Sequence, residues 1–228
     1  MGFFDFLRKY INDDQEDGYG LASIYKVKGC YCDEYLDAFM AECPEKNNDN
    51  RFTLCEIYTE LERYEEAQDC LDPITPSSIL DDITRGQLLH CRIMLFIETG
   101  KMDRALELFS DNKKFLDRFM KNPVRSKISG DFYSNAALLC AFASVAKDED
   151  IYIKRLREWC DLFPKNRLLL EITQVKILLL KKSEEAEDAF ALCRETILDF
   201  PDFQYEWERE YYLKKLDRAK KLFAADSN

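Results

Sequence analysis

Apolar residues recur along this chain at helical spacing, and short polar breaks interrupt the pattern. In residues 51–71, Leu54 and Tyr58 fall on one helical face, and after a polar break Ala67 and Leu71 mark a second helix. Residues three or four positions apart share a face of a helix. The segment is therefore typical of two amphipathic helices joined by a tight turn.

The same pattern returns in residues 88–109. There Ile93 and Phe96 precede a break at Gly100, and Ala105 lies on the apolar face of the next helix. Two-helix units of this kind cannot bury their apolar faces alone, so neighbouring units must stack, and stacked hairpins present a curved surface. The sequence therefore predicts an array of helical hairpins.

Further helices are expected along most of the chain. An amphipathic segment at residues 3–11 and an acidic linker reaching residue 20 precede one helical repeat domain, residues 21–228. After Gly100 one long helix is expected to reach about Met120. Two short helices are expected within residues 21–43, and the others at 51–62, 64–71, 82–98, 131–147, 149–163, 167–181, 184–199 and 203–223.

Composition favours an all-α protein. Hydrophobic residues make up 46% of the 228 residues and charged residues 34%, which suits a continuous core beneath solvated helix faces. The 7 Gly and 6 Pro are too few for the many turns of a β fold. The longest apolar stretch, residues 136–146, is too short to cross a bilayer, so we expect no membrane span.

The charge of the chain bears on its partners. With 33 basic and 44 acidic side chains the formal net charge is −11, and such a field repels phosphate backbones. We therefore expect no nucleic-acid partner and favour a protein. A local basic cluster leaves open a small anion or RNA patch, although a solvated helix end and loop is the favoured explanation: Lys113, Lys114, Arg118, Lys121, Arg125 and Lys127.

Cysteine usage indicates a reducing compartment rather than a metal site. The 9 cysteines are scattered, most at apolar helical positions where a thiol packs as a small hydrophobe, and the chain has 1 histidine. We expect no metal and no cofactor. Cys30 and Cys32 are the one close couple, and a zinc or redox role for them is the open alternative to ordinary packing.

The hairpin units resemble tetratricopeptide repeats, whose motif of 34 residues reads W-x2-L-G-x2-Y…A-x3-F…P. Ile93, Tyr152 and Lys176 depart from that motif, and 38 residues separate Ala67 from Ala105 (105 − 67). The matching positions are Leu54, Cys55, Tyr58, Ala67 and Leu71 in the first unit; Phe96, Ala105 and Phe109 in the second; Leu139, Cys140, Ala143 and Pro164 in the third; and Leu180, Ala189 and Pro201 in the fourth.

This resemblance covers about residues 50–201 and implies a right-handed superhelix of antiparallel helical hairpins. The aromatic start of the last helix suits a C-terminal cap over the final hairpin. Repeats of the HEAT or armadillo type are the second choice, since they use longer units and lack the Ala-x3-aromatic step. In such arrays the binding surface lies on the inner, concave face of each first helix.

By the same alignment a partner would contact a defined set of side chains. An apolar floor with a polar rim suits a peptide or a helix of a partner protein. Alternatively, these positions pack against the terminal helix or against a neighbouring chain. The floor comprises Phe52, Met94, Ala141 and Leu178, the rim Glu56, Glu98 and Lys181, and the remaining positions are Thr59, Gln87, His90, Ala137 and Gln174.

That face lacks the Lys and Asn clamp with which some tetratricopeptide proteins grip acidic C-terminal tails. Phe52 and Glu56 occupy the corresponding places in one unit, and His90 and Met94 in the next. Chaperone-tail binding of that kind is not expected. No phosphate loop, nucleophile elbow or metalloprotease motif occurs either, so we expect no enzyme, with a hydrolase built on paired carboxylates as the third possibility.

The N-terminal segment has two interpretations. Residues 3–11 place Phe3, Phe6 and Leu7 on one broad face with only two cations nearby, so docking on protein is favoured over a membrane surface. The start resembles those of many bacterial cytosolic proteins, which supports a cytoplasmic location. The sequence thus predicts a non-enzymatic adaptor that binds protein, with a peripheral protein docked through residues 3–11 as the alternative and a homodimer through the last helix as a possible assembly.

Overall fold

The computed structural model describes residues 31–74, 81–121, 139, 142–143, 164–203 and 205–225, and every regular element in these ranges is an α-helix. The expected all-α class is confirmed for this part of the chain. The chain divides into two compact units, Met1–Ser78 and Ile79–Asn228. None of the described helices is both long enough and apolar enough to cross a membrane.

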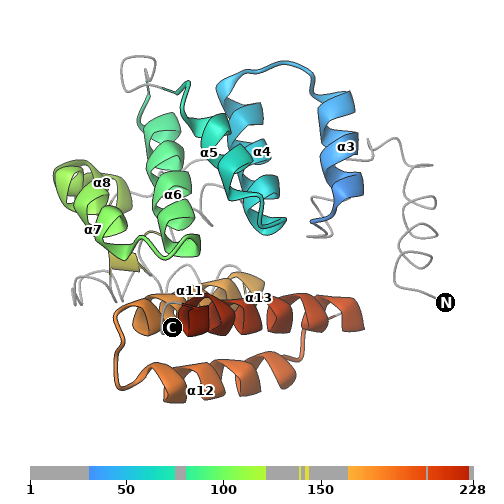
Figure 1. Cartoon of the computed structure of the whole chain (residues 1–228), viewed down its shortest axis with the longest axis vertical. Helices are drawn as coiled ribbons and strands as arrows, with labels where there is room; N and C mark the ends of the chain where they lie inside the picture. The colour runs from blue at the N-terminus through green and yellow to red at the C-terminus, as the bar shows by residue number, and fades with distance from the viewer. Residues whose placement is uncertain are drawn as a thin grey trace. The chain divides into compact units, whose positions relative to one another are not determined.

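The first unit contains α3 (Asp33–Glu42), α4 (Asn48–Glu60) and α5 (Tyr64–Leu71). The Asn47 side chain starts α4 by accepting a hydrogen bond from the Asn50 backbone N–H at 2.9 Å. α4 and α5 pack together as an antiparallel hairpin, and α3 packs on α4 (Figure 1). The core between α3 and α4 consists of Tyr35, Leu36, Phe39 and Ile57.

The second unit contains α6 (Asp82–Glu98), α7 (Met102–Asp111), α8 (Lys113–Lys121), α11 (Pro164–Leu180), α12 (Ala186–Leu198) and α13 (Glu206–Ala225). α6 and α7 form one hairpin, and α11 and α12 form another (Figure 1). α13 contacts both helices of the second hairpin, as expected from its aromatic start. Tyr212 and Leu216 of α13 join the core that α11 and α12 share.

The three first helices α4, α6 and α11 end in the same turn. In each, the residue after the C-cap has a positive φ: 62° at Glu62, 72° at Gly100 and 51° at Lys182. The N–H of the following residue then bonds a carbonyl five positions back, which is the Schellman arrangement that satisfies the last carbonyls of a helix. These bonds join Arg63 to Tyr58 (2.8 Å), Lys101 to Phe96 (2.8 Å) and Ser183 to Leu178 (3.0 Å).

Substitutions at these turns should have opposite effects. Gly100→Ala should lower the free energy of unfolding by about 1 kcal/mol, because a Cβ atom is disfavoured at positive φ. Lys182→Gly should raise it by about 0.5 kcal/mol, since it removes such a Cβ. Urea unfolding midpoints measure both changes. Shifts of both midpoints in the same direction would contradict the shared turn.

Inside the hairpins, the positions expected to pack are buried. Ala67 and Ala105 are fully buried, as are Leu71 and Phe109 four residues further along each second helix. A small residue lets the paired helices approach closely, and the large one fills the adjoining gap. Phe109 also contacts Phe142, with ring centroids 5.3 Å apart. The Ala-x3-large step therefore packs as predicted in α5 and α7.

The prediction of a single helix over residues 101–120 is wrong. Two helices, α7 and α8, meet at Asn112, whose φ of −106° and ψ of 11° leave the helical region. Its amide Nδ2 donates to the Leu108 carbonyl (2.9 Å), and its Oδ1 accepts from Arg85 (3.0 Å). Asparagine competes for backbone hydrogen bonds in this way. The break lets Phe115 of α8 reach the core.

Some expectations lie outside the described residues. These are the segment 3–11, the helices within 21–30, most of the pair 131–147 and 149–163, and Cys30. The superhelical arrangement of the hairpins and the single domain over residues 21–228 stay predictions. The remaining expected helices agree with the described ones to within a few residues at each end.

Candidate functional site

The predicted partner-binding residues of the first unit lie on α4 but differ in exposure. Phe52 is buried, with 7% of its surface exposed. Glu56 is exposed and accepts a hydrogen bond from the Tyr31 hydroxyl at 2.6 Å. Thr59 is half-buried, and its hydroxyl donates to the Cys55 carbonyl at 2.7 Å. Glu56 is thus the exposed residue of the three, whereas Phe52 is buried.

The predicted residues of the second unit lie on α6 and α11. Gln87, Met94, Gln174 and Leu178 are all half-buried, so each retains surface that a partner can reach. Gln87 and Met94 are two turns apart on α6, and Gln174 and Leu178 one turn apart on α11. Lys181 is exposed in the turn that follows α11. Ala137 and Ala141 lie outside the described residues.

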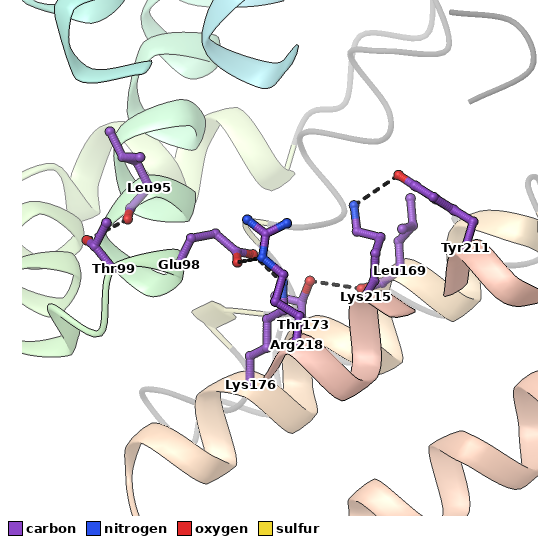
Figure 2. A network of polar contacts seen from close by, with 9 residues as sticks. All are labelled: Leu95, Glu98, Thr99, Leu169, Thr173, Lys176, Tyr211, Lys215 and Arg218. Atoms are coloured by element: carbon purple, nitrogen blue, oxygen red, sulfur yellow. Dashed lines mark hydrogen bonds and ion pairs between the residues drawn. The ribbon is translucent and has the colours of Figure 1, made fainter. Parts of the chain in front are cut away.

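Glu98 is not a rim residue, and that expectation is wrong. Its exposed fraction is 6%, and its carboxylate contacts two cations from other helices. Oε1 accepts a hydrogen bond from Lys176 Nζ of α11, and Oε2 lies 3.9 Å from Arg218 Nε of α13. Figure 2 shows the three side chains converging from α6, α11 and α13. The carboxylate therefore joins three helices instead of facing a partner.

The position of Glu98 explains why these cations are needed. Glu98 is the last residue of α6, and the C-terminal end of a helix carries partial negative charge that repels a carboxylate. Lys176 is also buried, with 5% of its side chain exposed, and an unpaired charge at such a depth is costly. Each buried charge is therefore tolerated because the other is present.

The electrostatic balance favours the ionised carboxylate. Burial alone would raise the pKa of Glu98, but the charge of Lys176, the hydrogen bond from it, and the charges of Arg218 and Lys215 outweigh burial. The pKa of Glu98 therefore lies below its ordinary value. Lys215 donates to the Tyr211 hydroxyl at 3.2 Å on the same helix (Figure 2).

Two threonine hydroxyls near this network donate hydrogen bonds to carbonyls four residues earlier in the chain. The Thr99 hydroxyl donates to the Leu95 carbonyl and the Thr173 hydroxyl to the Leu169 carbonyl, each at 2.8 Å (Figure 2). Thr173 is 3% exposed, so its own helix supplies the acceptor that a buried hydroxyl requires. These hydroxyls are thus satisfied locally and leave the carboxylate to the cations.

Lys176 was missed as a partner of Glu98 by sequence reasoning, which took it only as a departure from a leucine. A signal was present, because Lys176 lies within an otherwise mainly apolar run of α11 and the flanking Val175 and Ile177 are buried. A lysine in such a run needs an acidic partner. The sequence does not say which one, since 78 positions separate Lys176 from Glu98.

His90 occupies an unusual environment on α6. The residue is half-buried as a whole, but both ring nitrogens are inaccessible to solvent and have no hydrogen-bond partner among the described residues. Burial lowers the pKa of His90 to about 4. The imidazole is therefore neutral at physiological pH and does not offer its nitrogens to a partner on the predicted face.

The pKa values and the neighbours of the described thiols decide whether these can act as nucleophiles or metal ligands. Burial raises the pKa of Cys70 to about 11 and that of Cys193 to about 12, so neither is a thiolate near neutral pH. Within the described ranges no three His, Cys, Asp or Glu side chains gather as a metal site would require. Cys32 is half-buried, and its neighbour Cys30 lies outside those ranges.

The described part of the basic cluster on α8 is partly neutralised. Lys113 Nζ lies 3.3 Å from an oxygen of Asp117, and Arg118 Nη2 lies 3.7 Å from an oxygen of Asp82. Nearby acids reduce the attraction that these cations exert on a phosphate. Arg125 and Lys127 lie outside the described residues.

The chain matches no family model, no curated protein and no solved structure. The resemblance to tetratricopeptide repeats therefore stands on the sequence positions alone.

Proposed function

We propose that this protein is a non-enzymatic scaffold of tetratricopeptide-like hairpins that binds a peptide or helix of a partner protein. The observation that carries the proposal is the shared Schellman turn at the ends of α4, α6 and α11. It supports the view that three hairpins are variations of one unit, and arrays of such units generally serve to bind proteins.

The binding surface in the second unit consists of the half-buried residues of the first helices. Met94 packs against the core with part of its side chain, and Leu178 is half-buried on α11. Gln87 and Gln174 add neutral hydrogen-bonding groups beside them. Such a mixture of apolar and amide side chains suits an extended peptide or one face of a helix. Glu98 is not part of this surface, because it is buried.

A pair of variants tests the proposed surface. Met94→Glu on α6 should abolish recovery of the partner from a native lysate, because a carboxylate would be desolvated in the contact. Leu108→Glu on α7 is the matched control, since Leu108 is also half-buried and packs against the same core, but on a second helix. Mass spectrometry of the co-purified proteins is the measurement, and circular dichroism checks that both variants fold.

The outcomes separate the proposal from its alternatives. A protein recovered with the wild type and with Leu108→Glu, but lost with Met94→Glu, supports the surface and names the partner. Equal recovery with both variants would rule out this surface and direct attention to residues 3–11. Recovery of nothing above background with the wild type would contradict the scaffold function itself.

A further inference from the structure

The outer face of α12 has an uncommon composition. The cation of this helix, Arg194, is paired with Asp217 of α13, and Glu187 is paired with Lys220 of α13 at 2.9 Å. The exposed residues of α12 are acidic or apolar: Glu187, Asp188, Ala191, Leu192, Glu195 and Leu198. Leu192 is 65% exposed and Leu198 47% exposed. Leucines that are exposed to this degree leave apolar surface in water that burial against another molecule would remove.

The second helix of the other hairpin in this unit, α7, shows that a hairpin does not require exposed leucines. α7 exposes no large apolar side chain, and a cation, Arg104, stands among its acids. Its exposed residues are Asp103, Arg104, Glu107, Ser110 and Asp111. The exposed leucines thus distinguish α12 from α7.

The opposite face of α12 holds the helix firmly in place. Phe190, Cys193 and Ile197 are buried in the core shared with α11 and α13. Arg194 also bonds Asp217 of α13 at 2.7 Å. The inner face of α12 is therefore packed against α11 and α13, and the outer leucines cannot turn inward without loss of this packing.

The exposed residues of α12 form one continuous strip. Ala191, Glu195 and Leu198 follow one another at spacings of four and three residues, which places them on one face of the helix. Asp188 and Leu192 share the adjacent line with Glu195. The strip extends over most of the helix, about 15 to 20 Å at 1.5 Å per residue. By helical spacing, Leu192 neighbours Asp188 and Glu195, and Leu198 neighbours Glu195.

We propose that this strip is a second docking surface, which binds an amphipathic helix bearing leucine-like and Lys or Arg side chains on one face. Charge complementarity selects the partner, because Asp188 and Glu195 repel acidic segments and attract cationic ones. The apolar contact then comes from Leu192 and Leu198. This surface is distinct from the first-helix residues Met94 and Leu178, so its failure leaves the proposed scaffold function untouched.

A fluorescein-labelled amphipathic peptide of Leu and Lys, about 18 residues long and helical, provides the test. Its fluorescence anisotropy should rise to saturation with the wild-type chain. A Leu and Glu peptide of the same pattern should not bind. Leu192→Lys with Glu195→Lys should weaken binding about tenfold, since it removes an apolar contact and reverses a charge.

The control carries the same change in charge at another helix. Ser110→Lys with Glu107→Lys on α7 also adds three positive charges at exposed positions, and its affinity should stay within about twofold of the wild type. Leu192→Ser with Leu198→Ser, which leaves the charge unchanged, should also weaken binding. No saturable binding by the wild type, or equal weakening by the α7 and α12 charge variants, would overturn the proposal.

Discussion

Lys176→Met should lower the free energy of unfolding by about 3 to 5 kcal/mol, the largest effect expected of any substitution considered for this chain. The variant removes the ammonium that bonds Glu98 and leaves the carboxylate buried at the C-terminal end of α6. Arg218, at 3.9 Å, compensates only in part. Urea unfolding followed by circular dichroism measures the loss.

An exposed ion pair of the same unit provides the control for this prediction. Arg104 Nη1 lies 2.9 Å from Glu107 Oε2, but the side chains are 69% and 59% exposed. Arg104→Met should therefore change the stability by less than about 1 kcal/mol. If Lys176→Met costs no more than Arg104→Met, the buried contact of Lys176 and Glu98 does not form in solution.

A second variant separates the charge from the packing of Lys176. Glu98→Gln combined with Lys176→Met removes both charges while it keeps an oxygen that Arg218 can use as an acceptor. The double variant should recover a large part of the stability that Lys176→Met loses, because the cost arises mainly from an uncompensated buried charge. A double variant as unstable as Lys176→Met would attribute the loss to packing instead.

The stability of the protein should also fall between pH 6.5 and about pH 4 through His90. Burial depresses the pKa of His90 from 6.5 to about 4, so the unfolded chain binds a proton in this range that the folded chain does not. The slope is about 1.4 kcal/mol per pH unit and the total about 3 kcal/mol. His90 thus carries no titration penalty above pH 6.5, and a penalty on the folded state grows as the pH falls from 6.5 towards 4.

His90→Leu tests this prediction, since it removes the only histidine of the chain. Urea unfolding of the wild type and of the variant, from pH 7.5 to pH 5, should give diverging stabilities as the pH falls. At neutral pH the variant should be about as stable as the wild type, because neither buried nitrogen has a hydrogen bond to lose among the described residues. Parallel pH profiles would mean that His90 titrates normally in the folded state.

The pH range also separates His90 from Glu98. The folded pKa of Glu98 lies below its ordinary value of 4.5, so its contribution is present above that pH and is lost only as the pH falls further. Above pH 5, the difference in the free energy of unfolding between the wild type and His90→Leu therefore reports chiefly on His90.

The local rules of helix formation predicted much of the fold. The bounds of α6 coincide with the expected residues 82–98, and Asp81 caps this helix by accepting hydrogen bonds from the Ile83 and Thr84 backbone N–H groups. Such signals lie within a few residues of one another. The break at Asn112 was missed because an asparagine inside an amphipathic pattern is compatible with either outcome until its side-chain bonds are known.

The candidate site was harder to predict than the helices. Met94, Gln174 and Leu178 keep some exposed surface on the predicted face, whereas Phe52 and Glu98 are buried. Helical periodicity gives the direction of a side chain around its own axis, but not what another helix brings over it. In the case of Glu98, α11 and α13 bring the cations Lys176 and Arg218 onto the carboxylate.

Among the described residues, the sequence by itself therefore determined most of the helices, the hairpins α4–α5, α6–α7 and α11–α12, and the small residues Ala67 and Ala105 at the contacts of the first two, because these depend on neighbours at most a few tens of residues away. Only the tertiary structure decided that Glu98 and Lys176 are buried as a pair and that α12 leaves Leu192 in solvent. Both results depend on how separate hairpins pack. A carboxylate at a helix end and a leucine on a helix face have no fixed burial until that packing is complete.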